Sequence, residues 1–474
     1  QKIWDELGVS PRGIDREVVQ LMDITTMGVD NEYKSIITQG VRTALANGWG
    51  GSMIATELSD VLFGSPMPVR AEVNLGILKK DEVNILVHGH EPHLSEMIVA
   101  ATQDPEMIAY AKQKGANGIT LAGICCTANE ILMRHGISVA GNFLCQELAI
   151  LTGAVEAMVV DVQCIMPGLS EVAKCFHTKL VSTSPKARFP GDVQHIEFDE
   201  EHALEAAKRI VRLAIDNYQN RDKASVDIPS DKSGLIAGFT AENAYKFLGG
   251  RYRSTYRPLN NAIIEGRLRG LAGVVGCNNP NACQDLSHLE MTKELIKNDV
   301  LVVQTGCAAI ACAKAGLLTP EGARFAGPGL REVCEAVGIP PVLHLGACVD
   351  NSRILVALCN VLREGGLGED LSDIPVAGAA PEWMSEKAIS IGFYVVASGI
   401  FTVFGTPFPI MGAPKLADYI LDGMEKDYGA HFAFQEDPIT AAHLMIDHIN
   451  KKRAELKLRP MLSETEPAEA AVPA

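Results

Sequence analysis

The stretch VNILVHGHEPHLSEMIVAATQDPEMIAYAKQKGANGITLAGICCTANEILMRHG, residues 83–136, decides the fold because strand-like and helix-like segments alternate in it. VNILVHG is a short apolar run, and GITLAGI is a second one rich in β-branched residues and glycine. A segment with the spacing of a helix follows each run. Short apolar strands that alternate with helices are typical of a parallel sheet covered by helices.

The same alternation continues along most of the chain. It starts again after the polar stretch NRDKASVDIPSDKSG (220–234), which is the best candidate for a linker. The sequence predicts an α/β fold with two Rossmann-like, doubly wound parallel-sheet domains, at 76–218 and 219–458. Residues 1–75 have helical spacing and are expected to be part of a helical N-terminal domain. The Pro-, Glu- and Ala-rich residues 459–474 are expected to be a disordered tail.

For two glycine-containing regions the sequence predicts a specific local structure. The helical pattern of the N-terminal region is expected to be interrupted by a turn at Gly48–Gly51. From Ala388 to Pro414 no residue is charged, which is long enough to span a bilayer. Because glycines and prolines interrupt the β-branched runs FYVV and IFTVF, a buried strand-turn-strand is the preferred interpretation, and no membrane span is expected.

The composition is that of a globular protein in a reducing compartment. The net charge of −16 argues against nucleic acid or an anionic membrane as the main partner. Twelve cysteines in 474 residues, with no C-x-x-C pair, match neither a disulfide scaffold nor a structural zinc ribbon. The start QKIWDELGVSPRG has no charged, apolar leader, so a cytoplasmic location is expected.

Six of the strand-like runs end in a cysteine or a histidine. Ligands in open α/β sheets collect outside the carboxyl ends of the strands, so these side chains are expected to form the wall of one buried metal site. Thiolates favour soft metals and iron–sulfur clusters, and six donors are more than one zinc ion needs. The six are His90, Cys126, Cys164, Cys277, Cys307 and Cys348.

The neighbours of two candidates leave alternatives open. Cys125 and Cys126 would point to opposite faces of a strand, so both are not expected to bind one metal ion. His88 and His90 would point to the same face, so that one is a ligand and the other a supporting donor or a proton carrier. Ordinary packing is the preferred interpretation for the cysteines inside helical runs, namely Cys145, Cys175, Cys312, Cys334 and Cys359.

Together these motifs resemble the nickel-containing carbon monoxide dehydrogenases of anaerobes. The resemblance is carried by VHGHEP, GICCTANEILMRHG, VVDVQCIMPGL, GVVGCNNPN, VQTGCAAIACAKAGLLTPE, HLGACVDNSR and APEWMSEKAISIG, and it covers about residues 3 to 460. That family has a helical N-terminal domain and two Rossmann-like domains. The resemblance implies an oxidoreductase that interconverts carbon monoxide plus water with carbon dioxide, two protons and two electrons at a buried [Ni-4Fe-4S] cluster, the C-cluster.

The resemblance also implies a role for each site residue. His90 and Cys126 would hold a pendant iron, and Cys348 would hold nickel. Lys387 would be the catalytic cation, and Ile391, one turn further on, would line the carbon monoxide pocket. Cys125 would be a near neighbour rather than a ligand. The three cubane irons would be held by Cys164, Cys277 and Cys307.

The chain departs from the family in its first part. The family carries cysteines for further [4Fe-4S] clusters there, whereas residues 1–124 contain no cysteine, so those clusters are not supported by this chain. Since the chain starts with Gln1, a truncation is expected, and with it slow turnover of this chain alone. By resemblance the electron acceptor is ferredoxin-like, the oligomer is a homodimer, and an acetyl-CoA synthase subunit is a possible partner.

Two other functions remain as alternatives. One is a hybrid-cluster-type reductase of hydroxylamine or nitric oxide, which has the same fold but uses glutamate ligands and no nickel. The other is a non-catalytic scaffold that binds a cluster. Nickel and iron content would separate the three.

Overall fold

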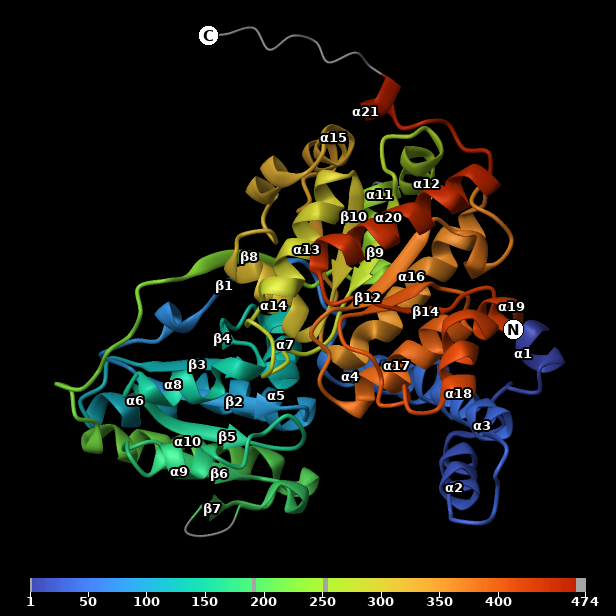
Figure 1. Ribbon diagram of the computed structural model, residues 1–474. Helices are drawn as coiled ribbons and strands as arrows, with labels where there is room; N and C mark the ends of the chain where they lie inside the picture. The colour runs from blue at the N-terminus through green and yellow to red at the C-terminus, as the bar shows by residue number, and fades with distance from the viewer. Residues whose placement is uncertain (1, 190–192, 250–254, 466–474) are drawn as a thin grey trace, which may run out of the picture.

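The computed structural model describes residues 2–189, 193–249 and 255–465, and its fourteen strands form one sheet. Their order is β14-β13-β12-β9-β10-β11-β8-β1-β4-β3-β2-β5-β6-β7. Strands β1 to β7 therefore make one half of the sheet and β8 to β14 make the other. Figure 1 shows these halves as two bodies, with the blue-green half below and the yellow-red half above.

Helices cover both faces of the first half. One face of β2 (Val83–Gly89) packs under α5 (Pro92–Thr102), α6 (Pro105–Gln113) and α10 (Ala203–Asn217). The opposite face packs against α8 (Gln146–Leu151) and α9 (Leu169–Ala173). Because both of its faces are buried, β2 is mostly apolar (VNILVHG), as expected of a central strand in a parallel sheet. The other strands of this half are β1 (Val69–Val73), β3 (Ile119–Ile124), β4 (Val139–Gly141), β5 (Val155–Val160), β6 (Lys179–Ser182) and β7 (Gln194–His195).

The second half repeats this arrangement. All its strand pairs are parallel, and its core joins the sheet to the surrounding helices. The strands are β8 (Ser233–Ala237), β9 (Gly270–Val274), β10 (Val300–Gln304), β11 (Val342–His344), β12 (Val376–Ala380), β13 (Thr402–Phe404) and β14 (Phe432–Phe434). The longer helices are α11 (Ala241–Gly249), α12 (Arg257–Ile264), α13 (Leu286–Lys297), α14 (Gly306–Lys314), α15 (Pro328–Val337), α16 (Asn351–Glu364), α17 (Glu386–Ala397) and α20 (Pro438–Glu455).

An antiparallel pair joins the two halves. β1 pairs with β8 from Val69↔Ala237 to Val73↔Ser233, while β1 is parallel to β4 and β8 is parallel to β11. The strand directions therefore reverse at this seam. Residues that follow the carboxyl ends of the two halves nevertheless come into contact, as the bond from the Cys348 N–H to the Cys126 Sγ shows. The mostly parallel α/β sheet confirms the predicted class, whereas the division into domains at 76–218 and 219–458 stays a prediction.

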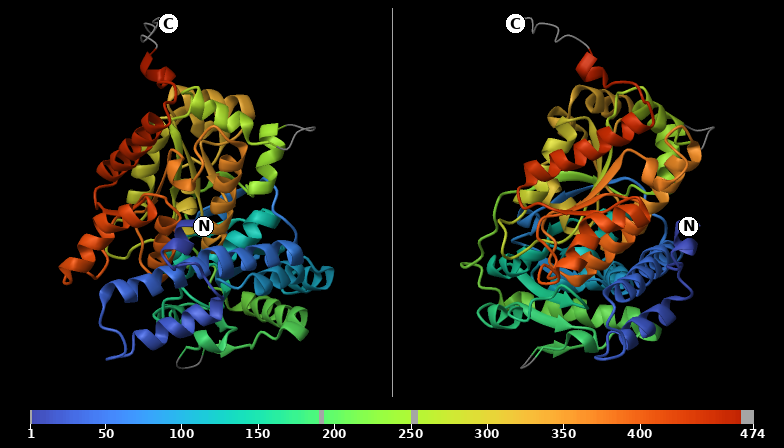
Figure 2. Two further views of the ribbon diagram at one scale, coloured as in Figure 1. Left: turned by 90° about the vertical axis from the view of Figure 1, so that its right-hand side faces the viewer. Right: turned by 45° about the vertical axis from the view of Figure 1, so that its right-hand side comes forward.

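The N-terminal helices lie along both halves, as the blue helices in Figure 2 show. Their bounds are α1 (Lys2–Glu6), α2 (Ile14–Ile24), α3 (Tyr33–Ala46) and α4 (Met53–Phe63). The expected turn at Gly48–Gly51 is wrong, because a π-helical segment at Asn47–Ser52 joins α3 directly to α4. A side chain at Gly48 would come within 2.5 Å of the Tyr394 ring, so this glycine allows the helix to pack closely on α17.

The uncharged region from Ala388 to Pro414 also differs from expectation. FYVV belongs to helix α17, and only Thr402–Phe404 of IFTVF forms a strand. Buried Ala388, Gly392 and Val396 recur at helical spacing, and tertiary packing of this face outweighs the β propensity of its residues. In the described part of the chain, no helix is long and apolar enough to cross a membrane.

The expected tail is structured at its beginning. Helix α21 spans Leu462–Thr465, and Ser463 donates a hydrogen bond to Asp299 at 2.9 Å. A disordered tail from 459 is therefore wrong as far as Thr465. Residues 466–474 lie outside the described residues.

Candidate metal centre

All six predicted donors lie at the carboxyl ends of strands that are neighbours in the sheet. His90 follows β2, and Cys126 lies in the first turn of α7 (Cys125–His135) after β3. Cys164 follows β5. In the sheet, these three strands are consecutive, in the order β3, β2 and β5. The other three donors, Cys277, Cys307 and Cys348, follow β9, β10 and β11, which are also consecutive. Each half therefore contributes three donors to the space between the halves.

His90 and Cys164 form a pair on the first half. The Nε2 of His90 lies 3.9 Å from the Cys164 Sγ, and its Nδ1 donates to the Val162 carbonyl at 3.2 Å. The bond at Nδ1 leaves Nε2 as the atom that faces the site. Burial disfavours the charged imidazole, but the Cys164 thiolate outweighs burial and raises the pKa of His90.

Cys126 and Cys348 meet across the gap between the halves. The backbone N–H of Cys348 donates to the Cys126 Sγ at 3.3 Å. Gly306 has a φ of +57°, and a side chain there would come within 2.6 Å of the Cys348 Sγ. Only glycine fits this contact, so the turn that precedes Cys307 is shaped to hold Cys348 close.

Cys125 lies beside Cys164 and Cys307, and these two thiols together with burial hold the pKa of Cys125 well above its usual range. Cys125 and Cys126 both open helix α7, with Cys125 at φ +62°, so they do not alternate along a strand as the sequence predicted. Cys125 thus lies close to the donor set, and its expected role as a neighbour rather than a ligand stays a prediction. Whether it is a ligand is not tested by these contacts.

Buried polar groups hold the two remaining donors. His288 Nε2 donates to the Cys277 carbonyl at 2.7 Å, and the backbone N–H of Phe143 donates to the Cys307 Sγ at 3.4 Å. Phe143 belongs to the first half, so Cys307 is a second place where the halves are in contact.

The pKa values of these thiols fit a site that binds a metal cation. Burial raises the pKa of Cys277 to about 12, and the Cys126 thiol together with burial holds the pKa of Cys348 well above its usual range. Hydrogen bonding by Cys125, helped by His90, instead lowers the pKa of Cys164 to about 4. Buried thiols become anionic when a metal cation offsets the cost of their burial.

The spacing of the donors fits a cluster better than a single ion. Among the described residues, no three His, Cys, Asp or Glu side chains converge closely enough to hold one metal ion. An iron–sulfur cluster takes about one cysteine for each iron, so its ligands surround a space and do not meet at a point. Five thiols and an imidazole around one space are the donor set that nickel and iron in sulfide favour.

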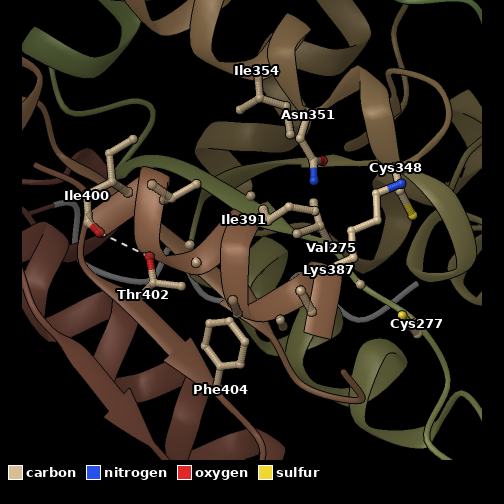
Figure 3. A pocket seen from close by; sticks show the side chains of 18 of the residues that line it. Val275, Cys277, Cys348, Asn351, Ile354, Lys387, Ile391, Ile400, Thr402 and Phe404 are labelled. Carbon is tan, nitrogen blue, oxygen red and sulfur yellow. Dashed lines mark hydrogen bonds between the residues drawn. The ribbon is translucent and has the colours of Figure 1, made fainter. Parts of the chain in front are cut away.

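An apolar cavity of about 80 Å³ opens from this space. Cys277, Cys348, Lys387 and Ile391 line it, and Figure 3 shows the Lys387 side chain reaching toward Cys348. Burial opposes the charge of Lys387, but the negative charge that the surrounding cysteines carry when deprotonated, first Cys348, outweighs burial and raises its pKa. A second apolar cavity of about 450 Å³ adjoins the first and shares Gly273, Ile354, Leu358 and Val376 with it.

His88 lies behind the donors and not among them. It is fully buried, its Nε2 donates to the Gln146 Oε1 at 3.0 Å, and burial lowers its pKa to about 4. The Gln146 Oε1 also accepts from the backbone N–H of Met166, two residues after Cys164. These contacts suit a supporting role for the Cys164 loop, and a catalytic role of His88 stays a prediction.

Sequence reasoning missed a functional role for Asp161, which lies between β5 and Cys164. Its side chain accepts hydrogen bonds from the backbone N–H of His90 at 2.5 Å and from Thr127 Oγ1 at 2.8 Å. The available signal was an acidic residue inside the apolar run MVVDVQC, where a buried carboxylate requires partners. Sequence reasoning also missed His344, which is buried at the end of β11. Its Nε2 donates to the Asn129 Oδ1 at 2.8 Å, and its Nδ1 accepts from the backbone N–H of Gly346 at 3.1 Å.

Comparison with known proteins agrees with this geometry. The model of the Prismane/CO dehydrogenase family matches residues 1–439. Carbon monoxide dehydrogenase 1 of Methanosarcina acetivorans is 57% identical over 458 residues, covering 97% of this chain and 72% of that protein. Carbon monoxide dehydrogenase 1 of Methanosarcina mazei is 56% identical over 457 residues, covering 96% and 72%.

A solved structure has the same architecture. The as-isolated, Ni-free carbon monoxide dehydrogenase of Thermococcus sp. AM4 superposes with a TM-score of 0.94 at 52% identity, covering 97% of this chain and 71% of that chain. Its likeness extends over both halves of the sheet and the N-terminal helices. The chain therefore belongs to the Prismane/CO dehydrogenase family and groups with its carbon monoxide dehydrogenase enzymes.

Proposed function

We propose that this oxidoreductase converts carbon monoxide and water to carbon dioxide, two protons and two electrons at a [Ni-4Fe-4S] cluster. The observation that carries the proposal is the meeting of five thiols and one imidazole between the two halves of the sheet, beside Lys387 and an apolar cavity. The cofactor is further supported by the family to which the chain belongs, whose relatives are carbon monoxide dehydrogenases.

Each donor has a proposed place in the cluster. His90 and Cys126 would hold the pendant iron, and Cys348 would hold nickel. When bound, the cluster would supply a soft metal for carbon monoxide, a Lewis-acidic iron for water, and storage for two electrons. The cubane irons would be held by Cys164, Cys277 and Cys307.

Lys387 supplies the positive charge of the site. Its raised pKa keeps the ammonium protonated at neutral pH, and it forms no ion pair with a carboxylate in the described ranges. A cation held in a dry site stabilises negative charge that develops on a reacting oxygen through a charge-assisted hydrogen bond. The residue therefore suits the oxygen atoms of the substrate as it becomes carbon dioxide.

Apolar side chains control what reaches the site. Ile391 lies one turn after Lys387 and lines the cavity with Ile354 and Phe404 (Figure 3). A narrow apolar cavity admits a small, weakly polar gas and offers bulk water few hydrogen-bond partners. We infer that Ile391 positions carbon monoxide beside the donors.

The proposal extends to the surroundings of the enzyme. A ferredoxin-like acceptor would take the two electrons, and the chain would work in the cytoplasm as a homodimer, with an acetyl-CoA synthase subunit as a further candidate partner.

The test uses the full chain, purified and loaded with metals without oxygen. We expect about four irons and one nickel per chain together with viologen reduction that depends on carbon monoxide. Iron without nickel and without this activity would favour the hybrid-cluster reductase instead. A chain that binds a cluster but catalyses neither reaction supports the scaffold, and a chain that binds no metal under any loading condition contradicts all three.

A further inference from the structure

Asp161 hydrogen-bonds to three different turns of the metal centre. The backbone N–H of His90 donates to its Oδ1 at 2.5 Å, and Thr127, the residue after Cys126, donates to its Oδ2 at 2.8 Å. The N–H of Val162, whose carbonyl accepts from His90 Nδ1, also donates to Oδ1. One carboxylate thus connects the ends of β2 and β5 with the start of α7.

Thr127 extends this network to the next residue of the β2 turn. Its Oγ1 accepts from the backbone N–H of Glu91 at 3.0 Å while it donates to Asp161. Two successive N–H groups of the turn, those of His90 and Glu91, are therefore bound by Asp161 and Thr127 together. The turn that carries His90 is tied to the helix that carries Cys126.

The backbone is shaped to let Asp161 approach. Gly89 has a φ of +134°, and a side chain there would lie 1.7 Å from the Asp161 Oδ1. Asp161 is 1% exposed, and it forms no ion pair within the described residues. A buried carboxylate without a cation is costly, so the three hydrogen bonds are what keep it in place.

We propose that Asp161 is a positioning residue that holds His90 and Cys126 in the relative placement needed for the pendant iron. This inference rests on the proposed function, because it assumes that these two residues share a metal. Asp161 touches neither the metal nor the substrate; it acts through the backbone of His90 and through Thr127. Supporting residues of this kind commonly change metal affinity by about 10- to 100-fold.

The test compares variants on the two sides of the network. Asp161→Asn and Thr127→Val each remove part of it with little change in volume, whereas Thr127→Ser keeps the hydroxyl. Glu156→Gln is the matched control, because Glu156 is a fully buried carboxylate at the opposite end of the same strand, bonded to Asn84 and Arg221. Iron and nickel per chain, chelator competition and the paramagnetic spectrum of the cluster are measured in all four.

We expect Asp161→Asn and Thr127→Val to lose about a quarter of the iron, with a 10- to 100-fold weaker hold on the lost ion. The cubane spectrum should remain, and Thr127→Ser should behave as the parent. Glu156→Gln should lower the unfolding temperature of the metal-free chain without changing its metal content. This pattern separates positioning from general destabilisation.

Two results would overturn the inference while leaving the proposed function intact. One is full iron and unchanged chelator resistance in both Asp161→Asn and Thr127→Val. The other is iron loss in Glu156→Gln as large as in Asp161→Asn, which would make the effect one of stability. If the parent chain itself binds no nickel or iron, the proposed function fails, and this outcome is recognised before any variant is compared.

Discussion

The two walls of the metal centre differ in how they are built. The wall from the first half is polar behind its donors, with Asp161, Thr127 and the His88–Gln146 pair hydrogen-bonded to the turns. The wall from the second half carries the apolar cavity, which is lined mostly by β9, β12, α16 and α17. Lys387 is the cation of that second wall.

This difference suggests a division of labour. Polar contacts to backbone groups fix the direction of donor side chains, which a metal requires. Apolar side chains define a dry space, which a gas and a strong electrostatic interaction require. The first half therefore serves the cofactor mainly, and the second half serves both the cofactor and the substrate.

The largest effect is expected where the two walls meet, at Cys348. Cys348→Ala removes the proposed nickel ligand and should lower carbon monoxide oxidation by more than about 100-fold, since changes outside the ligand shell alone reach that size. Viologen-linked oxidation and nickel content are the measurements. Cys359→Ala, a half-buried cysteine in α16, is the matched control and should keep both. Equal activity in the two variants would contradict the proposed place of Cys348.

Loss of the cation on the second wall should come next. Lys387→Met keeps most of the side-chain length and should lower the oxidation rate by about 100- to 1000-fold, as removal of one stabilising donor does. Nickel and iron content should stay near that of the parent, because the ammonium is not a ligand. Lys415→Met on exposed α18 (Pro414–Asp418) provides the control. A normal rate with full metal would exclude Lys387 from the reaction.

Narrowing the apolar cavity should have an intermediate effect. Ile391→Trp places a bulky ring in the space and should lower kcat/KM for carbon monoxide by about 10-fold, a barrier change of about 1.4 kcal/mol. Ile391→Val, which keeps the cavity open, should change it little. The rate at several gas concentrations is measured with metal content as a check. If the tryptophan variant loses metal instead, the cavity belongs to the cofactor and the proposed division is wrong.

The smallest effect concerns a histidine on the far side of the second half. Burial, followed by Lys452 and Lys451, lowers the pKa of His448 to about 4, and its ring stacks on Phe401 with centroids 4.8 Å apart. Because the unfolded chain binds a proton near pH 6.5 and the folded chain does not, stability falls as the pH drops from 6.5 toward 4. His448→Phe should remove about 2 kcal/mol of that loss near pH 4.5.

Urea unfolding of the metal-free chain at pH 7 and pH 4.5 measures this difference. The variant and the parent should unfold at similar urea concentrations at pH 7. A parent whose pH dependence equals that of the variant would show that His448 is protonated in the folded state.

The positions of the donors could be predicted from the sequence, because a strand that ends in a cysteine or histidine is a local pattern. Parallel strands place their carboxyl ends on one edge, so the three donors within each half follow from this pattern. The antiparallel β1–β8 pair that orients one half against the other has no comparable signal, so the approach of the two groups does not follow from the pattern alone. The backbone conformation at Cys125 and Cys126 could not be predicted from this strand pattern. They depend on a helix that starts at Cys125 with a positive φ, which the strand-like run does not reveal.

The other differences arise from contacts between distant segments. The π-helical segment at Asn47–Ser52 depends on Gly48 meeting Tyr394, and the helix through Tyr394 depends on α3 in return. The role of Asp161 depends on where Gly89 and Thr127 come to lie. Periodicity in the sequence describes one segment at a time. It therefore cannot predict contacts in which two distant segments determine each other's conformation.

The seam between β1 and β8 also sets an order of events during synthesis. A growing chain that has reached only β7 already carries His90, Cys126 and Cys164, but none of the donors of the second half. Segments made first can fold first, so the polar wall can exist as an exposed, half-formed site before Cys348 or Lys387 has been made. Under the proposed function, the full set of six donors would therefore be available only once the second half has added its strands to the first.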